Sequence, residues 1–218
     1  MHLVAGVEGW LSAREGEALF RCARACRGRG AIVEIGSWKG RSTIVLAAGS
    51  KAGSGTVVCA VDPYVGIPSR GLTSSVAEFQ ANIDAAGVAA LVRPYVQHSA
   101  EVARAFGEPV ELVYIDGAHD HAAVLDDFRH WFPKVIDGGT MAFHDTVGYA
   151  GPRRVVRDHV YRSRQFRRVR FADSLTYAEK VARSTAMERA VNECRWWINQ
   201  AYAVALGGVR RLRCTIGH

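Results

Sequence analysis

The 218-residue sequence predicts an α/β protein with a doubly wound, mostly parallel sheet of seven strands and a helical arm before the sheet. The main observation is a regular alternation of short apolar runs with helix-like segments between residues 29 and 150. Runs such as VVCAV and ELVYI are apolar on both faces, which is typical of parallel strands covered by helices on both sides. Because crossovers between parallel strands are right-handed, this alternation favours a doubly wound sheet.

The segment 7–26 predicts the helical arm. Its apolar residues recur at roughly helical spacing, and Ser12 followed by Glu15 has the pattern of a capping box at a helix start. We expect a single domain over residues 1–218. Within it, residues 1–28 form an arm or lid, 29–150 form the core that holds the candidate sites, and 151–218 form edge strands and a last helix.

The alternation predicts five strands and four helices in the core. The strands are expected at residues 32–35, 57–61, 92–96, 112–115 and 140–143, with helices at 41–48, 75–86, 100–105 and 122–131. After residue 151 the pattern becomes a basic helix, two adjacent strands within FRRVRFADSLTYAEKV and an aromatic-rich helix at 186–205. That last helix either covers the core or forms the interface of a homodimer.

The net charge of +7 has a local origin, because eight arginines lie between Arg153 and Arg170. They form a solvated surface, a docking surface for an acidic or polyhydroxylated substrate, or a nucleic-acid surface, although no nucleic-acid-binding motif accompanies them. The five cysteines match neither a disulfide framework nor a zinc-ligand spacing and are expected to be reduced thiols. No apolar run approaches the length of a membrane span, so we expect a soluble, cytoplasmic protein without a membrane partner.

The stretch AIVEIGSWKGRST at residues 31–43 predicts a strand, a glycine loop and a helix, and the second strand ends at Asp62. Such a βαβ unit is typical of nucleotide binding, but only Gly36 and Gly40 are present, and the third glycine that favours a pyrophosphate is missing. The pattern therefore favours a nucleoside without phosphates, with S-adenosylmethionine as the leading candidate. Asp62 either accepts both ribose hydroxyls or caps the turn before Pro63.

Polar residues around this loop extend the predicted cofactor site. Glu34, inside the first strand, is expected to orient the loop or to receive the amino group of the methionine portion. The hydroxyls of Ser37, Ser42 and Thr43 either donate to the ligand carboxylate or serve as helix caps.

Two further segments follow the second and third strands. Ser99 and Ala100 come after the third strand, at the edge where an adenine ring is expected. The long loop at 63–72 follows the second strand, at the edge where open α/β sheets bind ligands. We expect this loop to close over a bound substrate.

A second polar cluster lies in the run ELVYIDGAHDHAAVLDDFRHWFPKVIDGGTMAFHDT, where the fourth strand ends at Asp116 and the fifth ends at His144 and Asp145. Since both strands end at the same edge of the sheet, the two carboxylates are expected to chelate a divalent cation, and oxygen ligands suit Mg²⁺. The alternative is that the two acids only cap the following loops. His119 and His144 add imidazoles that accept protons near neutral pH.

These motifs identify a family resemblance. EIGSWKGRST, VDPY, the run from IDGAHDH to AFHDT and the N-terminal GWLSAREGEAL resemble the class I S-adenosylmethionine-dependent O-methyltransferases related to macrocin O-methyltransferase. The resemblance covers about residues 7–148. It implies a Rossmann-like fold, bound Mg²⁺ and transfer of a methyl group to a sugar hydroxyl, the 1-hydroxyl of a methylated mannoside being one such acceptor.

The resemblance also implies roles for individual residues. Those near the cofactor are Glu34, Gly36, Ser37, Ser42, Asp62, Ser99 and Asp116, and Gly40, Tyr64 and Ala100 complete the predicted cofactor set. The predicted metal ligands are Asp116 and Asp145, with His144 as a third candidate. Where some relatives place a catalytic acid, this chain has Ala118, and His144 replaces the acid that often precedes Asp145. An imidazole is therefore favoured as the base, His144 first and His119 second.

Three other functions remain open. A phenol or catechol methyltransferase would use the same metal and need an aromatic slot, which Trp10, Trp38 and Tyr64 are able to line, although these rings are equally suited to stacking on a sugar. A nucleic-acid methyltransferase or RNA-binding module would use the arginine segment and would show steep salt dependence. A cofactor-binding protein without activity would give Asp116 and Asp145 no reason to converge.

Overall fold

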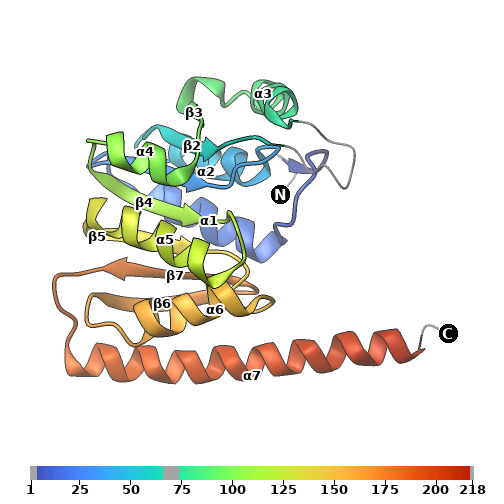
Figure 1. The fold of residues 1–218 in the computed structure, drawn as a ribbon, viewed down its shortest axis with the longest axis vertical. Coiled ribbons are helices and arrows are strands. Elements are labelled where there is room, and N and C mark those ends of the chain that lie inside the picture. Colours follow the sequence, from blue (N-terminus) through green and yellow to red (C-terminus); the bar gives the residue numbers. More distant parts are fainter. Residues whose placement is uncertain (1–3, 66–73, 217–218) are drawn as a thin grey trace.

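The computed structural model describes residues 4–65 and 74–216, with side chains as far as residue 205, and contains a seven-stranded sheet in the order β3-β2-β1-β4-β5-β7-β6 (Figure 1). The strands are β1 (Ala31–Ile35), β2 (Val58–Asp62), β3 (Val92–Val96), β4 (Val110–Ile115), β5 (Val135–Phe143), β6 (Phe166–Ala172) and β7 (Leu175–Lys180). The first five are parallel, and β7 is antiparallel to both β5 and β6. The predicted doubly wound, mostly parallel sheet is confirmed.

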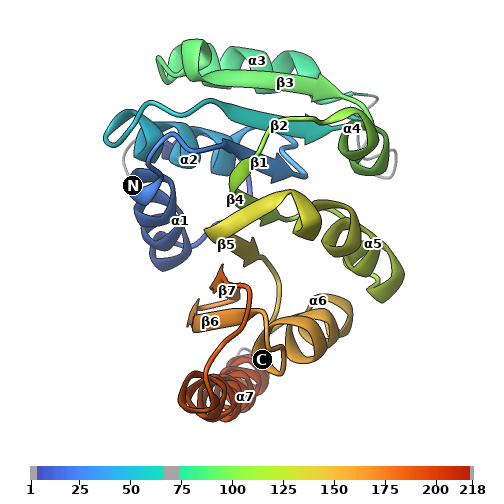
Figure 2. The same ribbon diagram turned by 90° about the vertical axis from the view of Figure 1, so that its left-hand side faces the viewer.

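Helices cover both faces of the sheet (Figure 2). One layer contains α1 (Ala13–Ala25), α2 (Arg41–Lys51) and α3 (Val76–Ala85), and the other contains α4 (Ser99–Ala105), α5 (His121–Trp131) and α6 (Ala150–Val156). Short turns η3 (Ala89–Leu91) and η4 (Phe132–Lys134) precede β3 and β5, and the π turn η5 (Arg157–Tyr161) extends α6. The predicted capping box starts α1, since Ser12 and Glu15 exchange hydrogen bonds with each other's backbone.

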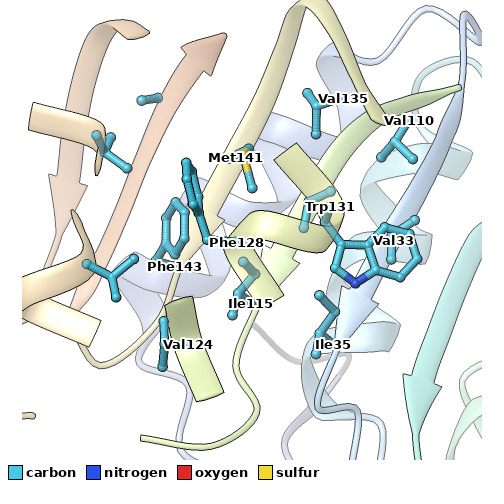
Figure 3. Packing of buried hydrophobic residues seen from close by; sticks show 14 of the residues in the cluster. Val33, Ile35, Val110, Ile115, Val124, Phe128, Trp131, Val135, Met141 and Phe143 are labelled. Atoms are coloured by element: carbon cyan, nitrogen blue, oxygen red, sulfur yellow. The ribbon is translucent and has the colours of Figure 1, made fainter. Parts of the chain in front are cut away.

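Each face of the sheet has its own hydrophobic cluster, because successive side chains of a strand point to opposite sides. Val33 and Ile35 of β1 belong to the cluster under α4 to α6, whereas Ile32 belongs to the one under α1 to α3. In the first cluster Trp131 is fully buried (Figure 3). Its ring nitrogen donates a hydrogen bond to Ser99 Oγ at 2.8 Å. This packing ties the start of α4 to α5, next to the predicted cofactor site.

Strand β5 begins earlier than the predicted 140–143. Val135 already pairs with Val110, and the next pair is Thr140 with Leu112, so residues 136–139 bulge out of the ladder. Gly138 in this bulge has φ +79°, a conformation that favours glycine. The glycine-containing bulge therefore divides one strand, of which the sequence predicts only the second part, residues 140–143.

Helix α7 (Ala186–Ile216) runs past β6 and beyond the sheet (Figure 1). One face packs on the protein and buries Asn192, Trp196 and Asn199. The other face exposes apolar side chains, which are Met187, Val191, Trp197, Ile198 and Val204. The helix therefore covers the core with one face and leaves an apolar face exposed.

Other expectations fall at the margins of the fold. No helix in the described part of the chain is long and apolar enough to cross a membrane. Cys22, Cys26, Cys59 and Cys194 form no disulfide with one another, and the side chain of Cys214 lies outside the described residues. Most of the loop at 63–72, which is predicted to close over the substrate, lies outside the described residues.

Candidate functional site

The carboxyl ends of the central parallel strands bring the predicted site residues to one edge of the sheet. Backbone hydrogen bonds link the residues that follow neighbouring strands. The amides of Gly36, Asp116 and His144 donate to the carbonyl oxygens of Val61, Ile35 and Ile115, with N–O distances of 2.9, 2.8 and 3.0 Å. Asp62, Gly36, Asp116 and His144 thus follow one another across β2, β1, β4 and β5.

Gly36 permits the close approach of β1 and β4 at this edge. Its φ is +88°, and a Cβ atom here would lie 2.2 Å from the backbone oxygen of Asp116. Any larger residue would push Asp116 away from the strand end. The glycine is therefore required to place the loop after β1 beside Asp116 at the end of β4.

Asp62 is fixed by the loop that it faces. Its Oδ2 accepts the Trp38 amide at 2.9 Å and its Oδ1 accepts the Tyr64 amide at 2.6 Å. Both donors have positive φ, 43° for Trp38 and 51° for Tyr64, so the backbone bends on each side to reach the carboxylate. The carboxylate is held at the cleft wall in a defined orientation.

Glu34 lies beneath the loop, fully buried, and accepts a hydrogen bond from the Thr43 hydroxyl. Burial raises the pKa of Glu34 to about 7, although the hydroxyls of Ser42, Thr43 and Ser37 oppose that rise. Its contacts are those of a residue that joins β1 to α2. It is not among the residues that line the cleft.

A cleft of about 1550 Å³ opens along this edge. Seven of the predicted cofactor residues line it: Gly36, Ser37, Ser42, Asp62, Ser99, Ala100 and Asp116. Glu34, Gly40 and Tyr64 lie behind its wall, where Gly40 caps α2 and Tyr64 packs on Phe79. The same cleft extends to His119, His144 and Asp145, so the two predicted clusters share one cavity.

The second cluster brings Asp116, His144 and Asp145 together. One potential ligand atom of each residue lies within 4.8 Å of those of the other two. Among the described residues, these three form a group that could hold a metal ion. His144 Nδ1 is 3.0 Å from Asp116 Oδ1 and 3.5 Å from Asp145 Oδ2. The other oxygen of Asp116 accepts the Tyr114 hydroxyl at 2.8 Å. Asp145 has φ +56°, a left-handed conformation that turns its carboxylate back toward the cluster.

His144 is surrounded by carboxylates. Burial lowers its pKa, but Asp116, Asp145 and Glu15 raise it, and on balance the pKa lies well above the usual value. His144 in turn lowers the pKa of Asp145, against the effect of burial. The negative charges of these carboxylates favour the protonated imidazole. A cation bound between Asp116 and Asp145 would take the place of the proton on Nδ1.

The donor set fits a divalent cation. Neighbouring ligands of an octahedral ion, each about 2.1 Å from it, lie about 3 Å apart. The separations of His144 Nδ1 from Asp116 and Asp145, 3.0 and 3.5 Å, are close to that value. Asp116 and Asp145 supply carboxylate oxygens, and His144 supplies one nitrogen.

His119 lies on the open side of the cluster. Its Nε2 is 2.7 Å from Asp145 Oδ2, and its ring stacks on Tyr149 with centroids 4.3 Å apart. Gly151 at the start of α6 permits this arrangement, because a Cβ atom there would lie 2.2 Å from the His119 backbone oxygen. The His119 side chain is 40% exposed, whereas that of His144 is 4% exposed, so His119 is the accessible imidazole.

Sequence reasoning missed a group of polar residues from distant segments. Glu15 Oε2 lies 3.4 Å from His144 Nε2, and Asp173 in the β6–β7 turn accepts the hydroxyls of Ser12 and Tyr202. Ser12, Glu15, Asp173 and Tyr202 line the cleft together with His144. The capping box of Ser12 and Glu15 was the available signal, but it indicated only a helix start.

The arginine segment lies away from this cleft. Five of its eight arginines form ion pairs with acidic side chains, namely Arg154, Arg157, Arg162, Arg167 and Arg168. The arginines between Arg153 and Arg170 are absent from the described cleft lining. Acidic neighbours therefore balance much of this charge on the surface of α6, β6 and α7.

Comparison with solved structures shows which proteins share this fold. The O-methyltransferase TomG from Streptomyces achromogenes, in complex with SAM, is 20% identical with a TM-score of 0.60 over 79% of this chain and 82% of TomG. An O-methyltransferase from Bacillus cereus, in complex with SAH, is 17% identical with a TM-score of 0.59 over 78% and 83%. An rRNA methylase from Streptococcus thermophilus is 12% identical with a TM-score of 0.56 over 79% and 99%. At these identities the similarity establishes the fold, and the fold accommodates different acceptors.

A family model also matches the chain. It is described as a methyltransferase domain and matches residues 33–146, just over half of the sequence. The matched segment runs from β1 through the end of β5, so it includes Gly36, Asp62, Asp116, His144 and Asp145. The chain belongs to this methyltransferase family and has the Rossmann-like fold of the class I enzymes.

Proposed function

We propose that the protein transfers a methyl group from S-adenosylmethionine to a hydroxyl of a small molecule, and that the acceptor is a sugar. The observation that carries the proposal is the single cleft that joins the Asp62 loop to the cluster of Asp116, His144 and Asp145. A nucleoside site and a cation site in one cavity are what a metal-assisted transferase requires.

The Asp62 half of the cleft is suited to the cofactor. Asp62 would accept the ribose hydroxyls, and Ser99 and Ala100 at the start of α4 would contact the adenine. Gly36 and Ser37 leave room for the methionine portion beside Asp116. S-Adenosylmethionine, when bound, supplies a methyl group on a positively charged sulfur.

Other residues of the same cleft are suited to a polyhydroxylated acceptor. Trp10 is 62% exposed and stacks on Trp38 with ring centroids 4.9 Å apart. This flat aromatic surface and the carboxylates of Asp145 and Asp173 line the same cleft. An aromatic face and carboxylate acceptors match the apolar face and the hydroxyls of a sugar ring. A phenol or catechol would use the same aromatic surface and is the alternative acceptor.

His119 is placed to take the proton that the acceptor hydroxyl must lose as its oxygen is methylated. It lines the cleft and is held by Asp145, whereas both ring nitrogens of the buried His144 face carboxylates. We therefore assign the base to His119 and place His144 with Asp116 and Asp145 in the cation site, for which the sequence predicts Mg²⁺. The cation, when bound, supplies positive charge that acidifies an acceptor hydroxyl.

Transfer of radiolabelled methyl groups to a panel of mannosides, macrolide sugars and catechols, with and without a divalent cation, tests the proposal. The expected result is cation-dependent transfer to a sugar hydroxyl, such as the 1-hydroxyl of a methylated mannoside. Transfer to catechols alone would replace the sugar by the aromatic acceptor. Transfer to RNA, or unchanged transfer after EDTA treatment, would contradict the proposal.

We also propose a homodimer formed by a second copy of the chain on the exposed face of α7. Met187, Val191 and Ile198 lie on this face at a spacing that places them along one side of a helix. A two-fold dimer would bury this face against the same face of the second copy. Light scattering should give twice the chain mass for the wild type and one chain mass for Ile198→Glu, and a monomeric wild type would reject the dimer.

A further inference from the structure

We propose that Glu15 orients His144 as a nitrogen ligand of the cation site, and that the site consequently prefers a divalent transition-metal cation such as Mn²⁺ over Mg²⁺. The inference rests on the cation site of the proposed function and specifies its chemistry. It concerns a residue of the N-terminal helix, 101 positions before the earliest predicted metal ligand, Asp116.

The two ring nitrogens of His144 face different carboxylates. Nδ1 faces the candidate ligands Asp116 and Asp145, at 3.0 and 3.5 Å. Nε2 faces away from them, toward Glu15 Oε2 at 3.4 Å. His144 is 5% exposed, and its Nε2 has no hydrogen-bond partner among the described residues. A shift of a few tenths of an ångström would turn the Glu15 contact into a hydrogen bond.

Glu15 is itself held in place from two sides. Its Oε2 accepts the Ser12 amide at 2.7 Å, and its Oε1 accepts the Ser174 amide at 2.8 Å. The side chain is 4% exposed. The carboxylate is therefore fixed by the start of α1 and by the β6–β7 turn before it meets His144. Helix capping alone would account for the Ser12 contact and not for the contact with the imidazole.

This arrangement fixes which nitrogen is free to bind a cation. An imidazole that donates its Nε2 proton to Glu15 presents an unprotonated Nδ1 to Asp116 and Asp145. Carboxylates commonly hold metal-ligating histidines in this way, fixing the tautomer and the ring orientation. Glu15 is thus a positioning residue, which acts through His144 and does not touch the cation.

The nitrogen ligand determines the type of cation. Mg²⁺ is a hard ion that takes oxygen ligands and dehydrates reluctantly, whereas imidazole nitrogen suits the later first-row metals such as Fe²⁺, Ni²⁺ and Zn²⁺. Mn²⁺ also takes oxygen ligands, but it begins the transition-metal affinity series and gains from a nitrogen ligand where Mg²⁺ does not. Two carboxylates and one imidazole therefore form a mixed site for Mn²⁺ and the metals that follow it in the affinity series. A chain with an acid at position 144 would present oxygen ligands alone.

Calorimetric titration of the full chain with Mn²⁺ and with Mg²⁺, without cofactor or acceptor, tests the inference. The wild type should bind Mn²⁺ at least about 10-fold more tightly than Mg²⁺. Glu15→Gln should weaken Mn²⁺ binding by about 10-fold to 100-fold, the usual effect of removing such a carboxylate. His144→Glu should reduce the preference for Mn²⁺ over Mg²⁺, because it replaces nitrogen with oxygen. Glu17→Gln, on the exposed side of the same helix, should change neither affinity.

Pulsed electron paramagnetic resonance of the Mn²⁺-loaded wild type keeps the inference testable if a variant fails to fold. The expected signature is coupling from a directly bound nitrogen, which His144→Glu removes. Equal affinities for the two ions, or a spectrum without nitrogen coupling, would overturn the inference. Nitrogen-coupled Mn²⁺ binding in a protein that methylates no acceptor would leave it standing and reject the proposed function instead.

Discussion

The imidazole of His119 and the carboxylate of Asp145 form a close pair, with Nε2 and Oδ2 2.7 Å apart. Asp145 belongs to the cation cluster, and His119 lines the cleft on its open side. The pair therefore connects the cation cluster, which would position the methyl acceptor, to His119, which would take the proton of the acceptor hydroxyl. A carboxylate that receives one ring nitrogen's proton leaves the other nitrogen to act as the acceptor.

Replacement of His119 by Gln should lower kcat by about 10²-fold to 10⁴-fold, the usual contribution of a positioned base. Affinity for S-adenosylmethionine should change little, because the imidazole lies in the other half of the cleft. Steady-state kinetics and calorimetric cofactor binding measure the two effects. His130→Gln is the control, since His130 hydrogen-bonds the Asp126 backbone of its own helix and is not among the residues that line the cleft. Near-normal turnover of the His119 variant would remove it as the base.

Replacement of Asp62 by Ala should weaken cofactor binding. Hydrogen bonds to a charged group contribute about 1.5–3 kcal/mol, which is about 10-fold to 150-fold in affinity. The substitution also removes the acceptor of the Trp38 and Tyr64 amides, which donate to the Asp62 carboxylate in the wild type. Calorimetric titration with S-adenosylhomocysteine measures the loss, and Asp84→Ala on the exposed side of α3 serves as control. Unchanged affinity would place the ribose elsewhere.

Glu34 should make stability depend on pH. Burial raises its pKa from 4.5 to about 7, so between these values the folded state binds more protons than the unfolded state. The sign follows directly: stability falls as pH rises from about 4.5 to 7, by an amount on the order of 3 kcal/mol for a shift of this size. Urea unfolding at several pH values should show that slope reduced in Glu34→Gln. Identical slopes in both proteins would show that Glu34 ionises normally.

Asp173 should stabilise the contact between the arm and the carboxyl-terminal third. It accepts Ser12 Oγ at 2.7 Å and the Tyr202 hydroxyl at 2.8 Å, and it pairs with Arg14 at 3.0 Å. Asp173→Ala should lower the free energy of unfolding by about 1–3 kcal/mol, because its partners lose an acceptor. Urea denaturation measures this change. A value equal to that of an Asp84→Ala control would show that the network contributes no stability.

Much of the fold and part of the site follow from local sequence. Apolar runs and helix periodicity placed the strands and most helix starts, since burial between two helical layers leaves a repeating pattern in the chain. Gly36, Asp62, Asp116 and Asp145 were predictable as neighbours for a related reason. Parallel strands end at the same edge, so residues that follow such strands meet without any further information.

The sequence by itself therefore determined the sheet, the glycine loop after the first strand and the meeting of Asp116 with Asp145. Only the tertiary structure decided that Glu15 faces His144 and that Asp173 links Ser12 to Tyr202. The contacts of Glu15 with His144 and of Ser12 with Asp173 join residues more than 100 positions apart, and they form because the arm lies against the turn of the β6–β7 hairpin. Such packing depends on side-chain shape in three dimensions and leaves no periodic signal in the chain.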